Sequence, residues 1–403
     1  MNQLIPRKIN LVFFVHLPQV WNSLKTICEA AINDKKFNVY ILTFDSLSNE
    51  CYDFFYQEYK NTKCCIIKYQ TQQDFENLKA DYVFYQVPYL HFYPNVNHEI
   101  VFANCKVCYM HYGMLLFAGE IEKSVIGGDY FFSKASVIFA ENNFSAKKYL
   151  QYHPKSNIIV SGYPRFDLIK PDNIEFEKKW CHKLFSFFTK HNRKNIKDYL
   201  KSSRNQNESQ LKTNKQLNII WTPRWEIFSG TCHFFDYKDL LVDYVKQNDN
   251  TSFLFRPHPL ALKNYVNSQE ISQENLDNYL KNFENNSRIK IDRELDYLQQ
   301  FYNSDVLITD MTSLIAEYFI TEKPIIYCNK NNVFNDFGLE ISKGLYWVNN
   351  WQELQNAIKM IKTGQDPLLE TRKQIIKDLF YLQPQGAGNF IKNFIKADFK
   401  KSN

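Results

Sequence analysis

Short apolar runs alternate with amphipathic segments along the first 170 residues of the chain. Apolar runs of about four to eight residues are typical of strands that are buried on both faces, and amphipathic segments between them are typical of covering helices. The clearest helical patterns lie at residues 20–33 and 144–152. The expected strands span residues 9–16, 37–44, 64–69, 82–87, 107–111, 136–140 and 158–160. The pattern therefore predicts a parallel sheet that is covered by helices on both faces.

The same alternation begins again at Leu217. A chain of 403 residues is too long for one ordinary core. The sequence therefore predicts an α/β protein with two Rossmann-like domains, residues 1–171 and 217–385, that face a central cleft. In the second domain, strands are expected over residues 217–221, 252–255, 288–291, 306–309 and 325–327, and helices near 236–247, 295–302 and 313–321.

Between the two domains, residues 172–216 have a different composition. They begin with an aromatic-rich amphipathic stretch, residues 176–189, and end in a polar stretch rich in Lys and Asn. We favour a connector whose aromatic side chains pack on the nearer domain, and the alternative is a basic, aromatic segment that lies on a membrane surface. At the other end, residues 386–403 follow a turn that contains Pro and Gly, and we expect a helix there that crosses back to the first domain.

The charge of the chain limits its partners. It has 49 Lys and Arg residues against 43 Asp and Glu residues, a formal net charge of +6. This charge does not indicate nucleic-acid binding, but it suits an anionic substrate or a peripheral contact with anionic lipid. No run approaches the roughly 20 apolar residues that span a bilayer, and the N-terminus has no signal-peptide pattern. We therefore expect a cytoplasmic protein, with any peripheral contact on the inner face of the cell membrane.

Nine cysteines are scattered along the chain, several of them in apolar strand patterns. A buried free Cys behaves as a small apolar residue. Cys105 and Cys108 have the spacing of a redox or zinc motif, but no second pair accompanies them. We therefore expect structural thiols, no metal site and no cofactor.

The stretch from Asp305 to Glu317 carries the strongest candidate for an anion site. An apolar strand there runs into a turn that contains Asp310, Thr312 and Ser313, and a helix follows. Thr and Ser are N-cap residues, and a helix N-terminus offers unpaired N–H groups and about half a positive charge. The alternative is an ordinary polar turn between a strand and a helix.

Basic side chains follow two other expected strands of the second domain. Arg256 and His258 come after the strand at 252–255, and Arg224 comes after the strand at 217–221. In a doubly wound sheet the C-terminal ends of neighbouring strands meet at one crevice. A guanidinium, an imidazole and a helix N-terminus that converge there would hold a diphosphate. The Pro-Arg-Trp step at Arg224 could present a cation and a stacking face to a nucleotide, or it could bury its Trp between the domains.

In the first domain, His111 ends a strand and Gly113 follows it closely. The usual pKa of a histidine lies near working pH, so His111 is a candidate general base; the alternative is a satisfied structural group. Further along, Tyr163, Arg165 and Asp167 lie in the turn after the last strand of this domain. Arg165 or Asp167 could face the cleft, or the turn could be structural with a surface arginine.

Taken in chain order, these motifs resemble the CDP-glycerol glycerophosphotransferase family, which contains the teichoic-acid polymerases and their capsule relatives. The resemblance runs from about residue 100 to the C-terminus, and residues 305–327 are its most specific part. It implies the GT-B fold, with the acceptor at the first domain and the nucleotide-linked donor at the second. The motifs in order are His-x-Gly at His111, Gly-Tyr-Pro-Arg at Arg165, Thr-Pro-Arg-Trp at Arg224, Arg-Pro-His at Arg256, Asp-x-Thr-Ser at Asp310 and Lys-Pro-Ile-Ile-Tyr at Lys323.

The resemblance also implies roles for individual residues. It places His111 where the base of the family acts, although the family usually has Trp-His-Gly-Thr where this chain has Met-His-Tyr-Gly. The positions of Tyr163, Arg165 and Asp167 remain cleft candidates without a defined role. The residues that the resemblance places at the donor diphosphate and the donor-binding helix start are Arg224, Arg256, His258, Asp310, Thr312 and Ser313.

The implied reaction transfers glycerol phosphate from CDP-glycerol to a hydroxyl of a cell-surface glycan or polyol phosphate, free or lipid-linked, in teichoic-acid or capsule synthesis. An alternative on the same fold is a glycosyltransferase that uses a CMP-, UDP- or GDP-sugar in capsule or lipopolysaccharide synthesis. A rival of another class is a non-catalytic module that binds an anionic polymer. The presence of His111, Arg256 and His258 in one chain argues against that module.

Overall fold

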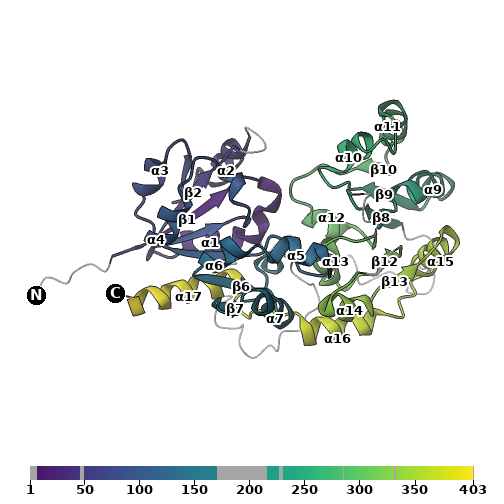
Figure 1. The fold of residues 1–403 in the computed structure, drawn as a ribbon. Helices are drawn as coiled ribbons and strands as arrows, with labels where there is room; N and C mark the ends of the chain where they lie inside the picture. Colours follow the sequence, from purple (N-terminus) through teal and green to yellow (C-terminus); the bar gives the residue numbers. More distant parts are fainter. Residues whose placement is uncertain are drawn as a thin grey trace, which may run out of the picture.

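Two α/β domains form the molecule, as Figure 1 shows, one from each half of the chain. This computed structural model describes residues 7–45, 50–169, 216–226, 230–284, 286–330 and 333–402. The segment expected as a connector or membrane-binding element, 172–216, lies outside the described residues except for residue 216. Among the helices of the described part, none combines the length and the apolar content needed to cross a membrane.

The first domain is a seven-stranded sheet in the order β3-β2-β1-β4-β5-β6-β7. Every pair of neighbouring strands is parallel. Its central strands are buried almost throughout, which explains why they read as continuous apolar runs. The strands are β1 (Ile9–Val15), β2 (Phe37–Thr43), β3 (Cys65–Lys68), β4 (Tyr82–Tyr85), β5 (Lys106–Met110), β6 (Val137–Ala140) and β7 (Ile158–Val160).

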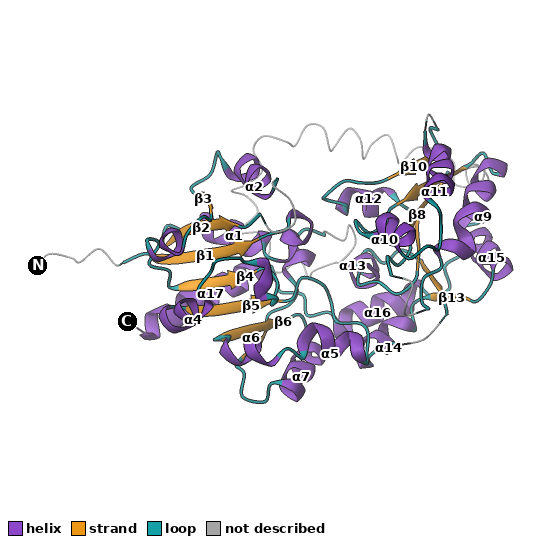
Figure 2. Ribbon diagram, turned by 45° about the horizontal axis from the view of Figure 1, so that its top comes forward, coloured by secondary structure: helices purple, strands orange, loops and turns teal. Residues whose placement is uncertain are grey.

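Helices and short 3-10 turns follow the strands of the first domain in alternation, as the sequence predicts. They are η1 (Pro18–Ser23), α1 (Lys25–Ile32), α2 (Cys51–Tyr59), α3 (Gln72–Glu76), η2 (Leu90–Phe92), α4 (His98–Asn104), α5 (Glu120–Ile126), α6 (Asp129–Lys134), α7 (Asn143–Tyr152) and η3 (Pro164–Asp167). In Figure 2 they lie on both sides of the orange strands of this sheet.

The second domain repeats this plan with a six-stranded parallel sheet in the order β10-β9-β8-β11-β12-β13. The order reverses between β8 and β11, so this is the switch point at which doubly wound sheets bind ligands. The strands are β8 (Leu217–Thr222), β9 (Thr251–Phe255), β10 (Ile289–Ile291), β11 (Val306–Thr309), β12 (Ile325–Cys328) and β13 (Tyr346–Val348). The helices are α9 (Phe234–Gln247), α10 (Ala261–Asn267), α11 (Gln273–Leu280), η7 (Lys281–Phe283), α12 (Leu298–Asn303), α13 (Leu314–Phe319), α14 (Asp336–Ser342), α15 (Trp351–Lys362) and α16 (Leu369–Leu379).

Some boundaries differ from the expected ones for local reasons. The helix expected at 20–33 is divided into η1 and α1, because Pro18 starts a separate 3-10 turn that ends before Leu24. The helix expected at 313–321 is only Leu314–Phe319. It ends early because Glu322, with φ of +62°, turns the chain toward Pro324 and β12.

Helix α17 (Ala387–Ser402) returns to the first domain and packs on α1, as Figures 1 and 2 show. Its Ile391 and Ile395 are fully buried. The ring of Phe394 meets Phe139 of β6 edge-on, with centroids 5.5 Å apart. The last helix of the chain therefore completes the core of the first domain.

The two domains touch beside their strand ends. Residues 114–118, which follow the loop after β5, contact residues 333–338 of the second domain. The Asn335 side-chain amide donates to the carbonyl of Leu115 at 3.0 Å, and its backbone N–H donates to the carbonyl of Leu116 at 2.9 Å. Phe117 and Phe334 form an antiparallel bridge, and their rings stack with centroids 5.4 Å apart. The loop that carries the histidine motif is thus fixed against the second domain.

Candidate functional site

The predicted donor residues lie at the C-terminal ends of three adjacent strands. Arg224 follows β8, Arg256 and His258 follow β9, and the turn that begins at Asp310 follows β11. Since β8 lies between β9 and β11, these residues share one edge of the second sheet. The fold therefore brings together the residues that the sequence predicts for the diphosphate.

Arg256 is held firmly in this edge. Its Nη1 donates to the Asp292 carboxylate at 2.6 Å and its Nη2 donates to the carbonyl of Glu294 at 3.0 Å. The guanidinium carbon also lies 4.3 Å from the centre of the Tyr297 ring. These three contacts fix the plane of the guanidinium while its side chain stays 13 % exposed. An oriented, partly exposed cation of this kind suits a phosphate oxygen.

The ring of His258 stacks on Trp225, with centroids 5.5 Å apart. His258 is exposed as a residue, yet desolvation by the surrounding protein lowers its pKa and the charges of Arg224 and Arg256 lower it further, to about 4. Its Nδ1 accepts from the Leu260 N–H at 3.2 Å. A neutral His258 therefore carries its proton on Nε2, which makes that nitrogen a hydrogen-bond donor to a ligand.

Arg224 and Asp310 hold the turn after β11 rather than stand out into solvent. Arg224 donates from Nη1 to the carbonyl of Met311 at 3.0 Å and from Nη2 to Glu226 at 3.0 Å. The Asp310 carboxylate accepts from the backbone N–H of His233 at 2.9 Å, and burial raises the pKa of Asp310 to about 7. Asp310, expected at the donor-binding helix start, thus lies beneath the site, because its carboxylate bonds the backbone of a neighbouring loop.

Thr312 and Ser313 lie where the helix α13 starts. The Thr312 hydroxyl accepts from the Leu314 N–H at 3.3 Å, whereas Ser313 at the N-cap makes no capping bond with its side chain. The helix has only 6 residues, so its contribution to anion binding is smaller than the sequence suggests. Across the domain boundary, a Cβ on Gly113 would come within 3.2 Å of the Ser313 Oγ. The small residue at Gly113 therefore lets the histidine loop approach the edge of the second sheet that carries the predicted donor residues. This edge is called the donor edge below.

His111 follows β5 of the first sheet and is 4 % exposed. Burial lowers the pKa of His111 to about 4. Its Nδ1 contacts both the carbonyl oxygen and the amide nitrogen of Gly113. The carbonyl can only accept, so that contact needs the ring proton on Nδ1, whereas the Gly113 N–H at 3.1 Å donates to an Nδ1 lone pair. The tautomer bonded to the carbonyl leaves the lone pair on Nε2. That Nε2 atom is buried and has no hydrogen-bond partner among the described residues. His111 is therefore an uncharged histidine, and in the tautomer with its proton on Nδ1 the unpartnered Nε2 carries the lone pair that accepts a proton.

Other polar groups without partners surround this strand end. The described residues provide none for the Tyr109 hydroxyl, the Tyr149 hydroxyl or either Glu141 carboxylate oxygen, all of them buried. Burial raises the pKa of Glu141 to about 7. Tyr163, by contrast, is satisfied: its hydroxyl donates to the carbonyl of Tyr112 at 3.0 Å and so supports the histidine loop from below. Unsatisfied buried polar groups are rare and call for a ligand or water.

The two remaining cleft candidates have different surroundings. The Asp167 carboxylate accepts from the N–H groups of Ala387 and Gly388, both at 2.8 Å. It therefore caps α17 and does not face the cleft, because the first turn of that helix supplies unpaired donors. Arg165 is buried rather than on the surface, and it crosses to the second domain, where it forms an ion pair with Glu317 of α13.

Three buried residues of this region were not among the residues that the sequence analysis proposed for the site. Glu317 pairs with Arg165 and accepts from the Tyr297 hydroxyl at 2.7 Å, and Glu141 lies buried after β6. The signal available for both glutamates is an acidic residue within or directly after an apolar run. Tyr297 has no comparable signal, because its neighbours come from other parts of the chain.

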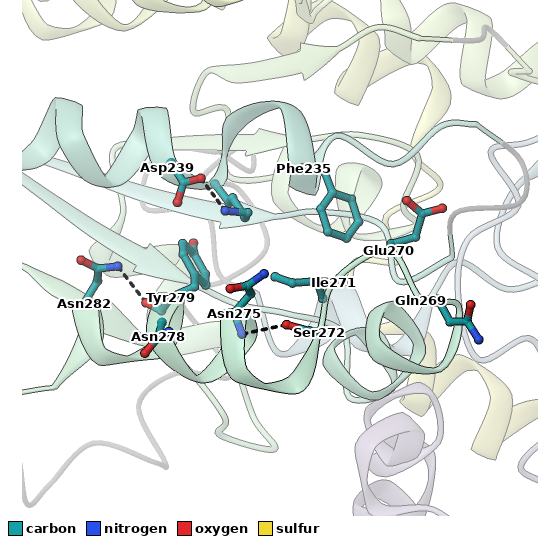
Figure 3. Close-up of a pocket in the computed structure, with 11 residues that line it drawn as sticks. Phe235, Asp239, Gln269, Glu270, Ile271, Ser272, Asn275, Asn278, Tyr279 and Asn282 are labelled. Carbon is teal, nitrogen blue, oxygen red and sulfur yellow. Dashed lines mark hydrogen bonds and ion pairs between the residues drawn. The ribbon is translucent and has the colours of Figure 1, made fainter.

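Two pockets lie outside these strand ends. One of about 510 Å³ opens between the domains and is lined by residues of η1 and α2 together with Leu295. Its acidic residues Glu50, Asp53 and Glu58 do not suit a diphosphate. The other, about 530 Å³, lies on α9 and α11, where Figure 3 shows Phe235 and Tyr279 among several amide side chains. Neither contains a residue of the predicted site.

The described residues form no group of three or more His, Cys, Asp or Glu side chains that could hold a metal ion. The cysteines among them are free thiols, most of them buried and Cys65 exposed. The thiol of Cys105, the C-cap residue of α4, bonds the Val101 carbonyl of that helix at 3.0 Å, and Cys108 is buried in β5. Cys105 and Cys108 therefore have structural surroundings.

Comparison with known proteins bears on the second domain and on the fold. The family model described as CDP-Glycerol:Poly(glycerophosphate) glycerophosphotransferase matches residues 193–334. This range contains every predicted donor residue and leaves His111 outside it. The match confirms the resemblance in the second domain. The comparison with curated proteins gives no match.

Solved structures resemble the whole chain. A variant of the wall teichoic acid polymerase TagF has a TM-score of 0.61 and 16 % identity, covering 98 % of this chain and 90 % of that one. A putative UDP-N-acetylglucosamine 2-epimerase from Listeria monocytogenes has a TM-score of 0.59 and 14 % identity, covering 98 % of both chains. The MnaA structure of S. aureus with UDP has a TM-score of 0.55 and 13 % identity, covering 91 % of this chain and 90 % of that one. At such identities the likeness establishes the fold, and it confirms the expected GT-B arrangement.

Proposed function

We propose that this chain, a glycerophosphotransferase by the family match over residues 193–334, transfers glycerol phosphate from CDP-glycerol to an acceptor hydroxyl. The observation that carries the proposal is the position of Arg256 and His258 at one edge of that matched domain, whose Ser313 at the same edge lies against Gly113 of the His111 loop. A TagF variant soaked with CDPG is among the structural neighbours, which supports the choice of donor. The acceptor we propose is a glycan or polyol phosphate of the teichoic-acid or capsule type, free or lipid-linked.

In the proposed reaction, Nε2 of His111 takes the proton of the acceptor hydroxyl while the oxygen attacks the β-phosphorus of CDP-glycerol. The new phosphorus–oxygen bond forms as the bond to the CMP oxygen breaks, and CMP leaves. Arg256 offsets the charge on the phosphates and the neutral His258 donates a hydrogen bond to them from Nε2, the positioning and electrostatic work that dominates phosphoryl transfer. Ser313 lies where the acceptor loop meets the donor edge.

The environment of His111 fits this role. Its pKa of about 4 keeps the ring uncharged at neutral pH, so the lone pair on Nε2 is available before the acceptor binds. The bound diphosphate is an anion, and an anion near the ring raises the pKa of an imidazole. Donor binding would therefore make His111 a stronger base at the time of transfer.

The nucleotide product tests the proposal. Purified protein is incubated with CDP-glycerol and a saccharide or polyol-phosphate acceptor, and the released nucleotide and the mass of the acceptor are read together. We expect CMP and the added mass of one glycerol phosphate. We also expect activity to persist in EDTA, because the Arg256 cation and the hydrogen bond from His258 stabilise the phosphates in place of a metal ion.

Parallel incubations with CMP-, UDP- and GDP-sugars test the alternative that the protein is a glycosyltransferase. Release of UDP or GDP with a hexose-sized mass gain would assign a glycosyltransferase instead. Because a CMP-sugar also releases CMP, the transferred mass decides between the two reactions. Complete loss of activity in EDTA would contradict the metal-free mechanism.

A further inference from the structure

Arg165 belongs to the first domain but finds its partners in the second. Its guanidinium forms an ion pair with Glu317 of α13, and both side chains are almost fully buried. Its central carbon lies 4.2 Å from the centre of the Tyr297 ring. A buried charge that crosses a domain boundary is costly unless it is paired, so this contact fixes the η3 turn of the first domain to the second domain.

Tyr297 connects this contact to the donor edge. The same ring lies 4.3 Å from the guanidinium carbon of Arg256, and its hydroxyl donates to Glu317 at 2.7 Å. Each guanidinium on the ring is attracted to its electrons, and this attraction is stronger in a desolvated setting. A displacement of Arg165 or Glu317 would therefore move Tyr297 and change the orientation of Arg256.

A second buried arginine shows what a purely structural role looks like in this chain. Arg372 is fully buried, and its Nε, Nη1 and Nη2 bond the Glu322 carbonyl, the Gly344 carbonyl and the Asp366 carboxylate. Arg165 has one carboxylate partner, and its Nη2 finds no hydrogen-bond partner among the described residues. A residue selected only for stability would satisfy its donors as Arg372 does.

We propose that Arg165 is a positioning residue that makes donor binding depend on the contact between the two domains. Through Tyr297 and Glu317, the turn of the acceptor domain sets the place of Arg256 in the donor site. The inference rests on the proposed function, because it takes Arg256 to be a ligand of the donor diphosphate. Donor affinity in this chain is thus a property of both domains.

The test uses CDP as the probe and the full chain. The main variant is the pair Arg165→Met with Glu317→Gln, which removes both buried charges together, while the Gln can still accept from the Tyr297 hydroxyl. Its control is Ile358→Ala, a cavity variant of a fully buried residue in the second domain away from the site. Arg256→Ala, alone and combined with the pair, completes the cycle. CDP affinity and the melting temperature are measured for each protein.

We expect the pair to weaken CDP binding on the order of fivefold, whereas Ile358→Ala lowers the melting temperature and leaves the affinity within about twofold. In the Arg256→Ala background, the pair should have little further effect on affinity, because the residue it positions is absent. Arg165→Lys should weaken CDP binding as well, since an ammonium lacks the planar face that lies on Tyr297.

Two results would overturn the inference alone: wild-type CDP affinity in the pair while Arg256→Ala binds weakly, or an equal loss from the pair in both backgrounds. Wild-type CDP affinity in Arg256→Ala would instead remove the diphosphate assignment and, with it, the positioning role. The single-site variant therefore separates failure of the proposed function from failure of this inference.

Discussion

The strand ends of the two domains differ in how the hydrogen bonds of their polar side chains are satisfied. At the edge of the first domain, which we propose binds the acceptor, His111, Tyr109, Tyr149 and Glu141 are buried, and each has a polar atom without a partner in the described structure. At the donor edge, Arg224 and Arg256 keep some exposure, and carboxylates and carbonyls orient both.

The difference follows from the chemistry proposed for each edge. A general base needs a free lone pair, so the acceptor edge tolerates unsatisfied groups at about 1–3 kcal/mol each. A phosphate site needs cations at fixed positions, and partners that bond the back of a guanidinium provide this while part of it remains free for a ligand. The proposed base thus has a free ring nitrogen, whereas a carboxylate and a carbonyl hold the arginine proposed to bind the phosphate.

Removing the base should produce the largest effect. His111→Ala is expected to lower turnover by about 10²–10⁴-fold and leave CDP affinity nearly unchanged, because a general base need not touch the nucleotide. Single-turnover rates and CDP titrations check this. His153→Ala is the matched control, since His153 is a buried histidine that bonds the Ile126 carbonyl at 2.6 Å. It should affect stability and not turnover. Near-normal turnover in His111→Ala would show that His111 is not the base, and the contrast between the two edges would lose its chemical explanation.

Substitutions at the donor edge should act on binding. Arg256→Ala and His258→Ala each remove a contact worth roughly 1.5–3 kcal/mol when it is charge-assisted, which is about 10- to 100-fold in CDP affinity. Titration with CDP measures this loss of affinity. Arg288 makes its bonds to carbonyls near β9 away from the site, so Arg288→Ala should leave CDP affinity unchanged. Wild-type affinity in both site variants would show that the diphosphate binds elsewhere.

The smallest effect concerns stability and pH. The pKa of Glu141 is raised from 4.5 to about 7, so the folded state holds its proton more tightly than the unfolded chain does. Folding therefore loses stability as the pH rises from about 4.5 through 7. Glu141→Gln avoids this loss and should be more stable than the wild type at pH 8 by about 1–2 kcal/mol.

Urea unfolding at pH 5 and pH 8 measures the Glu141 effect, and the difference between variant and wild type should shrink toward pH 5. Glu370→Gln, at an exposed position, is the control and should change little at either pH. An advantage of Glu141→Gln that is the same at both pH values would mean that Glu141 does not titrate as described.

The strands that are continuous runs of apolar residues could be predicted from the sequence. Strands such as β1 and β11 are continuous apolar runs because parallel sheets bury both faces, and the residues that follow them could be placed at one edge. Strand β13 was missed because the three residues Tyr346–Val348 give too short a pattern. The surroundings of Arg165 and Asp167 could not be read from sequence, because Glu317 and α17 are far away along the chain and only the folded structure brings them close.

Helix α17 gives the molecule a particular order of synthesis. The first domain is built from residues 9–169, yet Ile391 and Ile395 fill its core. The Asp167 carboxylate can accept from the N–H groups of Ala387 and Gly388 only after these late residues have been synthesised. At about 5–20 residues per second, a ribosome needs on the order of ten to forty seconds to travel from the one to the other. During that interval the surface of the first domain that α17 later covers is open to solvent and chaperones. The first domain therefore cannot complete its core before the second domain has been synthesised.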